Sequence, residues 1–583
     1  MRYKTILKLL VFFLISSSKC LFCQILAQNS QHLSVTDHEF DNGSKILSIP
    51  LTSEKIENLR LLGKIWGFLK YYHPQVAQGK YNWDYELFRI LPKVINAKTT
   101  QERNHVFLSW INKLGPIKRG TKEVLDSVRV KLYPDIAWIS ENKTLGSKLC
   151  LELEKIKSAK RPENNYYISL IPNVQNPDFS HENEYIQTPF PDTGYRLLAL
   201  YRYWNIIEYY NPNKHLIKKN WDSVLCEFIP QFISDSTALQ YKLSVLSLIS
   251  CISDTHADLY GDPDIENFKG KYMAPYRIAF IENKPVIIDR MQENDSDSAL
   301  HNGDIILKID SVNIETIISQ KLLYTSGSNY PAQLRKIASD LLRTNKSVLN
   351  VTYQRDSLIK NVNISINRTK ISIDNYFKNK QPDSSYRIIT PKIGYIYPGN
   401  IKAIYIDQIM AKLLNTKGII IDLRYYPAES IIHKFGEYIY PKPVIFEISS
   451  TGSITTPGLF MLKKQPNRVG GNKTNVLYHG KVILLVNEYT QSHGEFTAMA
   501  FSQYNQTTTI GSTTAGADGN VSRFYLPGGI MTLISGIGVY YPDGRETQRV
   551  GVSIDINISP TINGIKDGRD ELLEKAVDLL NTQ

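Results

Sequence analysis

Cysteine is scarce in this sequence, and the spaced ligand motifs of zinc sites are missing. Only five of the 583 residues are cysteines, and Cys20 and Cys23 both lie in the N-terminal segment. The other three, Cys150, Cys226 and Cys251, are too few to form a disulfide framework in a chain of this length. Because no Cys-x-x-Cys or His-Glu-x-x-His spacing occurs beyond the N-terminal segment, we expect no metal site and no other cofactor.

The main part of the sequence also lacks a concentrated basic surface and a long apolar run. The formal net charge is +12, and the N-terminal segment before residue 28 contributes positive charge without any acidic residue. The remaining positive charge is spread thinly, which argues against a nucleic-acid partner. No later apolar run is long enough to span a membrane. The apolar content of 42% is ordinary, so the chain has enough apolar residues for several folded domains.

The first residues have the pattern of a secretion signal. Three basic residues precede an apolar core, Leu9 to Ile15, which is too short to span a bilayer. We expect residues 1–27 to be a signal peptide that is cleaved at Ala27, and the protein to be periplasmic or extracellular. An earlier cleavage point at Ser16 to Ser18 stays open. A lipoprotein anchored through one of the two N-terminal cysteines is a poorer alternative, because the residues before each cysteine are weak lead-ins to lipidation.

A pattern of aromatic residues, prolines and aspartates occurs twice in the N-terminal half. Each copy predicts an aromatic-rich helix, a turn that contains proline and a second helix that starts near Trp-Asp. Two copies are too few for a solenoid, so we expect a duplicated helical hairpin. We place the copies in an N-terminal helical domain with a linker, residues 28–190, and in a second helical unit, residues 191–266. The matching residues are Trp66, Tyr71, Tyr72, Pro74, Trp83, Asp84 and Pro92 in one copy and Trp204, Tyr209, Tyr210, Pro212, Trp221, Asp222 and Pro230 in the other.

Short β runs replace the helical pattern over residues 267–366. The segment from Ala299 to Ile314 contains Gly303-Asp304 directly before an apolar strand, and it resembles the PDZ domain signature. PDZ-type domains bind extended peptides by adding a strand to a sheet edge. We therefore expect a PDZ-like β domain here, with a generic small β domain as the alternative. The expected strands are Tyr276–Ile281, Pro285–Asp289, Asp304–Ile309 and Val348–Tyr353.

Strands and helices alternate in the last unit, residues 367–583, which predicts an α/β domain around a sheet. We expect strands at Ile393–Tyr397, Gly418–Leu423, Val482–Val486 and Thr507–Ile510, and helices at Lys402–Asn415 and Glu495–Tyr504. The fold class is therefore α/β multidomain.

The junction between an apolar strand and a helix near Ser492 is the strongest candidate for chemistry. The run Val482 to Val486 predicts a buried strand, and the helix start follows shortly after Ser492. A serine at such a junction is often an exposed nucleophile, and the free N–H groups of a helix start can bind an oxyanion. The alternative is that Ser492 only caps the helix.

Taken in order, these pieces resemble a known family. A histidine after a helical region, a PDZ-like unit, Asp422-Leu-Arg424 at a strand end and the Ser492 junction resemble the carboxy-terminal processing (tail-specific) serine peptidases and their tricorn-like relatives. The segment Gly511 to Gly519 looks like the glycine loop of this family. The resemblance implies a C-terminal serine peptidase catalytic domain of the ClpP/crotonase-like α/β kind, and polypeptide substrates.

The resemblance also assigns roles to individual residues. In one branch a lysine of the glycine loop activates the serine, but Ala517 occupies that position here. The tricorn-like branch uses a histidine that follows a hydroxyl residue, and His256 follows Thr255. We therefore expect Ser492 to be the nucleophile and His256 the general base, since a serine hydroxyl needs an adjacent base. The acidic position that supports the histidine aligns with Gln548; Glu546 is a nearby acidic alternative.

The oxyanion hole is expected to consist of backbone N–H groups. One is that of His493, and the other is that of Tyr425, with Tyr426 as an alternative. Asp422 and Arg424 are expected to form a structural pair.

Three functions follow from these patterns. The first is an exported serine endopeptidase that cuts unfolded or C-terminally marked polypeptides. The second is a catalytically inactive peptide-binding scaffold on a peptidase fold, which the missing lysine and the glutamine at position 548 favour. A polymer hydrolase with paired carboxylates is the third, and no matching pair stands out. The sequence leaves the oligomeric state and the preferred cleavage site open.

Overall fold

The computed structural model describes residues 36–121, 125–291, 299–366, 381–471 and 475–582. The expected signal peptide, residues 1–27, and the two N-terminal cysteines lie outside this part of the chain. The architecture is mixed α/β and multidomain, as expected. The chain divides into two units; in the described part, the first comprises residues up to 121, 136–167 and 192–198, and the second the remainder. Among the described residues, no helix combines the length and apolar character needed to cross a membrane.

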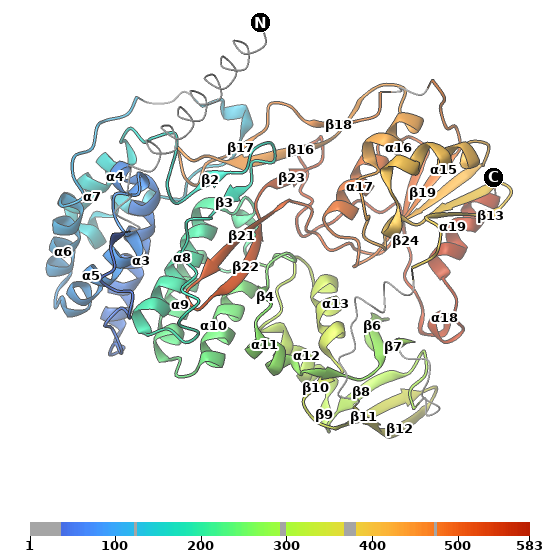
Figure 1. Cartoon of the computed structure of the whole chain (residues 1–583), viewed down its shortest axis with the longest axis horizontal. Helices are drawn as coiled ribbons and strands as arrows, with labels where there is room; N and C mark the ends of the chain where they lie inside the picture. Colours follow the sequence, from blue (N-terminus) through green and yellow to red (C-terminus); the bar gives the residue numbers. More distant parts are fainter. Residues whose placement is uncertain (1–35, 122–124, 292–298, 367–380, 472–474, 583) are drawn as a thin grey trace, which may run out of the picture. The chain divides into compact units, whose positions relative to one another are not determined.

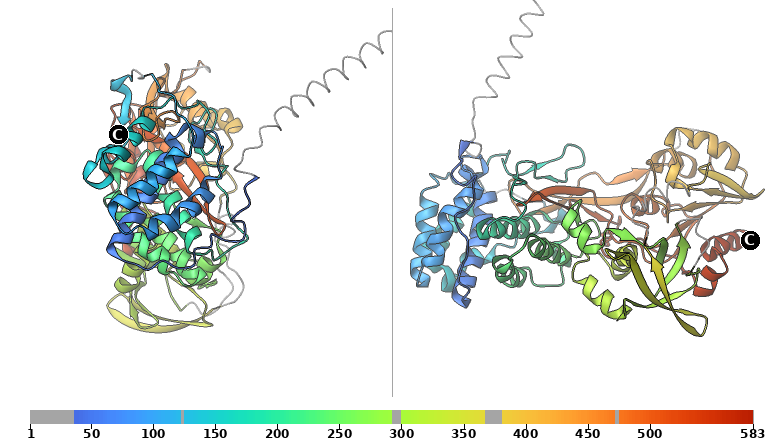
Figure 2. Two further views of the ribbon diagram at one scale, coloured as in Figure 1. Left: turned by 90° about the vertical axis from the view of Figure 1, so that its left-hand side faces the viewer. Right: turned by 60° about the horizontal axis from the view of Figure 1, so that its bottom comes forward.

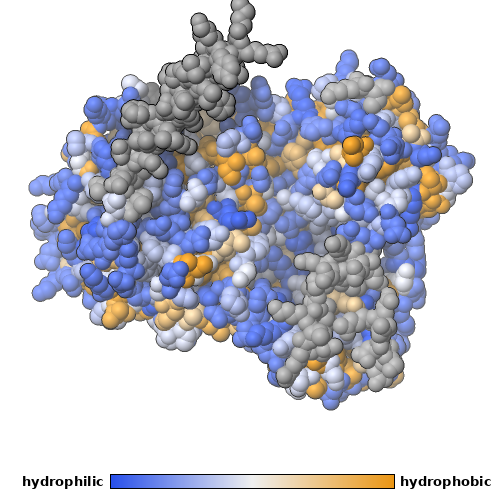
Figure 3. Space-filling view, in the orientation of Figure 1, coloured by the Kyte–Doolittle hydropathy of each residue, from blue (hydrophilic) through white to orange (hydrophobic). Residues whose placement is uncertain are grey.

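The first unit is helical. Its helices pack side by side around a core that is rich in aromatic residues (Figures 1 and 2). Hydrophilic residues cover most of its surface on the face seen in Figure 3, as the burial of the aromatic stripes requires. The helices are α3 (Ser53–Tyr72), α4 (Pro74–Ala77), α5 (Trp83–Asn96), α6 (Thr100–Asn112) and α7 (Asn142–Lys157).

The residues of the internal repeat make the same contacts in both copies. The indole of Trp66 donates to the carbonyl of Trp83 at 2.9 Å, and the indole of Trp83 donates back at 3.0 Å. In the second unit, Trp204 and Trp221 exchange the same two hydrogen bonds at 2.8 and 3.1 Å. A buried indole N–H needs a partner, and each tryptophan supplies the partner of the other. The tryptophan pair therefore has the same two hydrogen bonds in both copies of the sequence repeat.

The second unit begins with further helices and continues into a β domain. The helices are α8 (Thr193–Tyr210, of which the part from Ala199 belongs to this unit), α9 (Trp221–Ser234), α10 (Ala238–Ser250) and α11 (Pro263–Lys269). The β domain contains an antiparallel sheet in the order β12-β11-β8-β7-β6, with β9 paired to β8. Its elements are β6 (Tyr276–Ile281), β7 (Lys284–Arg290), β8 (Ile305–Ile309), β9 (Val312–Asn313), α12 (Ile314–Leu322), α13 (Tyr330–Asp340), β11 (Val348–Arg355) and β12 (Leu358–Ser365). A small pair, β5 (Tyr272–Met273) and β10 (Arg343–Thr344), flanks it.

The C-terminal part is built on a sheet whose central strands are parallel. The order is β13-β14-β15-β19-β20-β24, and only β13 pairs in the antiparallel sense. The uninterrupted apolar sequence of β15 and β19 follows from burial on both faces. Alternate residues of these strands pack under α15, α16 and α17 on one face, and the others pack under α19 on the other face (Figure 1). The strands are β13 (Tyr386–Thr390), β14 (Ile393–Ile396), β15 (Gly418–Asp422), β19 (Lys481–Val486), β20 (Thr507–Gly511) and β24 (Ile556–Asn557).

Two smaller sheets, the antiparallel pair of β2 and β3, and several helices complete the second unit. One sheet has the order β1-β17-β16-β18, with β23 paired to β16, and the other has the order β21-β22-β4. The pairing of β22 with β4 brings Leu259 and Tyr260, which follow His256, beside Thr532 and Met531 near the start of β22. The bounds are β1 (Val130–Leu132), β2 (Ser169–Leu170), β3 (Pro177–Asp178), β4 (Leu259–Tyr260), β16 (Val444–Gly452), β17 (Phe460–Leu462), β18 (Asn467–Val469), β21 (Val521–Leu526), β22 (Ile530–Ser535), β23 (Gly538–Tyr540), α15 (Ile406–Leu413), α16 (Ile432–Ile439), α17 (His493–Phe501), α18 (Ile562–Lys566) and α19 (Glu571–Asn581).

The strands and helices expected in the C-terminal part are confirmed, with shifts of a few residues at their ends. The strand Tyr276–Ile281 is confirmed at the expected bounds. The β16–β18 segment and the β21–β22 hairpin were not expected, because their short strands are only partly apolar.

Candidate active site

Ser492 lies in the turn between β19 and α17, directly before the first residue of the helix. Its backbone has φ 53° and ψ −118°, a conformation that residues with a side chain rarely adopt. Such strain costs about 1–3 kcal/mol and persists only where neighbouring contacts hold it. Here the backbone N–H of Ser492 donates to the carbonyl of Ala517 at 3.0 Å and to Oε2 of Glu495 at 3.2 Å. These two hydrogen bonds therefore hold the backbone of Ser492 in this conformation.

Glu495 ties this turn to the glycine loop. Its side chain is buried, with 1% of the residue exposed. The carboxylate accepts hydrogen bonds from the N–H groups of Gly516 at 2.8 Å and Ala517 at 2.9 Å, from the hydroxyl of Thr514, and from the N–H of Ser492. A buried carboxylate is tolerated only when donors surround it. Glu495 thus supports the helix start and also fixes the loop opposite.

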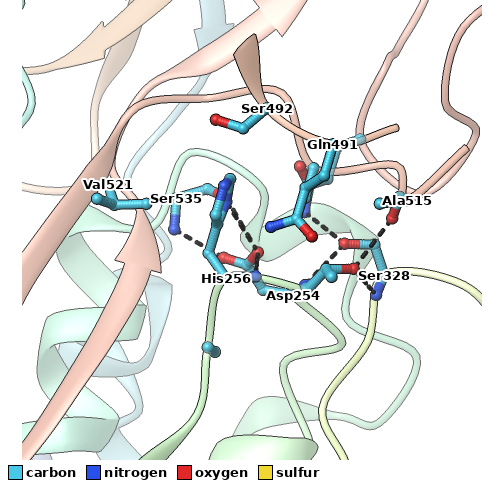
Figure 4. Close-up of polar contacts among 12 residues, drawn as sticks. Asp254, His256, Ser328, Gln491, Ser492, Ala515, Val521 and Ser535 are labelled. Atoms are coloured by element: carbon cyan, nitrogen blue, oxygen red, sulfur yellow. Dashed lines mark hydrogen bonds and ion pairs between the residues drawn. The ribbon is translucent and has the colours of Figure 1, made fainter. Parts of the chain in front are cut away.

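The same loop holds the segment that carries the histidine. The hydroxyl of Thr255 donates to the carbonyl of Ala515 at 3.0 Å. The backbone N–H of Thr255 donates to Oγ of Ser328 at 2.9 Å, and the N–H of Ser328 donates to the hydroxyl of Thr255 at 2.8 Å. Ala515 therefore anchors Thr255, the neighbour of His256, and Ala517 anchors Ser492 itself, so that one loop brings two segments far apart in the sequence into one site (Figure 4).

His256 is held by a partner that the sequence analysis did not identify. Its Nδ1 lies 3.0 Å from Oγ of Ser535, and that hydroxyl donates to Oδ1 of Asp254 at 3.1 Å. Asp254 also accepts from the backbone N–H groups of His256 at 3.0 Å and of Ser535 at 2.7 Å. Because the single proton of the Ser535 hydroxyl is directed to the carboxylate, its oxygen accepts from Nδ1–H of the imidazole. This fixes the tautomer in which Nε2 carries the free lone pair of a base.

The electrostatic surroundings keep the imidazole neutral. Burial lowers the pKa of His256 below its ordinary value of 6.5, and the cationic side chains of Lys336 and Arg335 lower it further. The carboxylate of Asp254 acts in the opposite sense and raises it, with Oδ1 lying 3.7 Å from Nδ1. A neutral imidazole at neutral pH is the form that can accept a proton. No hydrogen bond joins it to Oγ of Ser492 in the described structure, as is common when no substrate is bound (Figure 4).

Gln548 and Glu546 do not contact His256. The amide of Gln548 donates to Oγ of Ser328 at 3.2 Å. Because Ser328 is the hydrogen-bond partner of Thr255, Gln548 reaches the histidine segment only indirectly. Glu546 pairs with Lys131 at 2.8 Å and with His215 at 3.0 Å. Asp254 and Ser535 occupy the place that the sequence analysis gave to Gln548. The signal in the sequence was Asp254, which lies two residues before His256. At this spacing an aspartate carboxylate can accept a hydrogen bond from the backbone N–H of the residue two positions later.

The structure distinguishes between the donors proposed for the oxyanion hole. The N–H of His493 is at the start of α17, and no partner is recorded for it in the described part of the chain. The N–H of Tyr425 is directed to the carbonyl of Asp422 at 3.4 Å, whereas Tyr426 lines the pocket beside Ser492 together with His493. The backbone N–H of Tyr425 is thus already engaged, and Tyr426 stays the alternative donor at the pocket. Asp422 and Arg424 form the expected pair at 2.7 Å, at the end of β15.

The comparisons with known proteins concern the C-terminal part of the sequence and the fold. Residues 392–558 match the sequence model of Peptidase family S41. The fold resembles the crystal structure of mature CPAF (12% identity, TM-score 0.52, covering 67% of this chain and 98% of that one) and that of mature CPAF complexed with lactacystin (12% identity, TM-score 0.51, covering 67% and 99%). The tricorn protease is also similar (13% identity, TM-score 0.34, covering 67% and 37%), but at this similarity it does not assign the chain to the tricorn-like branch. No curated sequence matches the chain. The chain is a serine-type peptidase, a hydrolase.

The strain at Ser492 has a measurable consequence. Glycine adopts positive φ without a steric penalty, whereas alanine keeps the strain that serine has. We expect Ser492→Gly to be more stable than Ser492→Ala by about 1 kcal/mol, after the entropic cost of glycine in the unfolded chain is included. Denaturant unfolding of the two variants, followed by circular dichroism, measures the difference. Equal stabilities, or a more stable alanine variant, would show that the turn is not strained.

The contacts of His256 predict the direction in which its pKa moves. We expect the imidazole to titrate below pH 6.5 in the wild-type protein, because burial dominates. Asp254→Asn removes the negative charge that favours the imidazolium, so the pKa should fall further. Histidine-selective ¹³C NMR measures both values, and His256→Gln assigns the signal. A pKa above 6.5, or a pKa that rises in Asp254→Asn, would contradict this electrostatic description.

Proposed function

We propose that the protein is an exported serine endopeptidase that hydrolyses unfolded or C-terminally marked polypeptides. The observation that carries this proposal is that one loop holds both Ser492 and the segment of His256, while Ser535 and Asp254 form a hydrogen-bonded chain to His256 that favours a neutral base with Nδ1 protonated. Export rests on the N-terminal sequence pattern alone, and it places the substrates in the periplasm or outside the cell.

The proposed chemistry is acyl transfer through Ser492. Nε2 of His256 accepts the hydroxyl proton while Oγ attacks the substrate carbonyl, and the N–H groups of His493 and Tyr426 stabilise the oxyanion that forms. His256 then gives the proton to the leaving amine, and a water molecule hydrolyses the acyl-enzyme by the same steps. Asp254 stabilises the imidazolium through Ser535, and Thr255 holds the histidine segment in place. Gln548 supports this arrangement indirectly through Ser328.

The β domain offers a place for the substrate chain. We interpret residues 267–366 as a PDZ-like domain, in which β6 is the edge strand of the described sheet and α13 packs beside it. A hollow of about 430 Å³ is lined by residues of β6, α13 and the turn before Ser492. Arg335 of α13 donates to the carbonyl of Glu488 at 2.7 Å and to Oε1 of Gln491 at 2.6 Å. A peptide that pairs with β6 as an extra strand would thus lie beside α13. Arg335 of this helix contacts the turn before Ser492.

Digestion of a reduced, unfolded protein tests this function. We expect Ser492→Ala and His256→Ala to lower the rate by about 10⁴-fold, and Asp254→Asn to lower it by about 10² to 10⁴-fold, because the base loses its orienting charge. Gln548→Ala should change the rate by less than about tenfold, since its contact is indirect.

His433→Ala is the matched control, because this histidine is exposed and lies outside the site. All variants are first compared with the wild type by circular dichroism. If folded wild-type protein leaves the substrate intact, or if Ser492→Ala cuts as fast as the wild type, the proposed function is wrong. Tight peptide binding without turnover would instead support a scaffold.

A further inference from the structure

A pocket of about 420 Å³ opens directly beside the nucleophile. Ser492 and His493 line it on one side, and Glu447 of β16 and Asp518 of the glycine loop line it on another. Asp518 follows Ala517, whose carbonyl accepts the hydrogen bond from the N–H of Ser492. The carboxylate is thus fixed near the nucleophile by the same loop that fixes the turn.

Asp518 is buried without a hydrogen-bond partner. The residue is 6% exposed, and neither Oδ1 nor Oδ2 has a partner among the described residues. This contrasts with Glu495, whose buried carboxylate receives four hydrogen bonds. Burial raises the pKa of Asp518 well above its ordinary value, and the carboxylates of Glu495 and Glu447 add to this effect. A buried carboxylate that lacks donors is costly, so its retention in a pocket points to a ligand that supplies them.

The other charged groups of the pocket do not compensate Asp518. Oε2 of Glu447 accepts from the amide of Asn467 at 2.5 Å. Burial raises the pKa of Glu447 above its ordinary value, and hydrogen bonds from Ser449 and Asn467 and the nearby ammonium of Lys463 offset this only in part. The ammonium of Lys463 donates to the carbonyl of Val174 at 3.1 Å. Two carboxylates therefore face one ammonium, and the pocket keeps an excess of one negative charge when both are ionised.

The place of the pocket identifies which part of a substrate would enter it. His493 supplies the N–H proposed to bind the oxyanion, so the attacked carbonyl lies at the mouth of the pocket. His256, which returns the proton to the leaving amine, does not line this pocket in the described part of the chain. The pocket is therefore on the acyl side of the scissile bond, where the side chain of the residue that contributes the carbonyl projects.

We infer that this pocket selects a lysine or arginine side chain at the residue that contributes the attacked carbonyl, with Asp518 as its counter-ion. An ammonium or guanidinium group brings several N–H donors and a positive charge, which are the two things that Asp518 lacks. The inference rests on the proposed function, since it names the substrate class of the same site. Asp518 would set specificity without taking part in proton transfer.

Peptides that differ at one position test the inference. A fluorogenic peptide is prepared with lysine, arginine, leucine, alanine or glutamate at the residue before the scissile bond. We expect kcat/KM of the wild type for lysine and arginine to exceed that for leucine by about 100-fold, as expected for a buried polar group that is otherwise unpaired. Asp518→Asn, which keeps the shape, should remove most of this preference by lowering the lysine and arginine values toward the leucine value. Asp383→Asn is the control, because Asp383 is exposed.

The possible results distinguish a failure of the specificity inference from a failure of the proposed function. If the wild type cuts the peptides without preferring a cationic residue, or if Asp518→Asn keeps the wild-type ratio, the inference is wrong and the Ser492 chemistry stands. If the wild type cuts none of the peptides and no unfolded protein, the proposed function fails, and the inference with it.

A second measurement uses the wild type alone, in case Asp518→Asn does not fold. Benzamidine and benzamide have the same shape, but only benzamidine is a cation. We expect benzamidine to compete with a lysine peptide at least about tenfold more strongly than benzamide, because only the cation pairs with Asp518. Equal inhibition by the two compounds would overturn the inference.

Discussion

The geometry of the site depends on one buried carboxylate. Glu495 can remain in the interior only because four donors surround it, and these donors come from both the Ser492 turn and the glycine loop. Satisfying this single side chain therefore sets the distance between the turn and the loop. The strained backbone of Ser492 is held by the same arrangement, since one of the four donors is its own N–H. This hydrogen bond therefore holds the strained backbone of Ser492 and also helps to satisfy the buried carboxylate of Glu495.

The loop carries this constraint to the histidine. Ala515 and Ala517 use their carbonyls to hold Thr255 and Ser492, so the proposed nucleophile and the segment of the proposed base are positioned by groups two residues apart. Backbone carbonyls can do this without a charged side chain, which explains how the site is organised although alanine replaces the lysine of the related loops. The charge that the base needs comes from Asp254 instead, relayed through the hydroxyl of Ser535. The glycine loop thus positions residues, and a different segment supplies the electrostatics.

The sequence predicted the parts of the site that have a local signal. Ser492 could be proposed as the nucleophile because β19 is a continuous apolar run that ends in a helix start, and His256 could be proposed as the base through its place in the ordered motifs. Asp254 had a local signal that was missed. Ser535 had none, because it ends a strand of mixed polarity and meets His256 across 279 residues. The isolation of Asp518 could not be predicted either, since a sequence shows a carboxylate but not whether donors surround it.

The central claim is that Ser492 is a nucleophile activated by His256, and a fluorophosphonate that reacts with activated serines tests it most directly. Mass spectrometry of the labelled wild-type protein should place one adduct on Ser492. The labelling rate should rise with pH through the lowered pKa of His256, and Asp254→Asn should slow it. Labelling at Ser492 that is unaffected by His256→Ala, or the absence of an adduct on Ser492 in folded protein, would contradict the account.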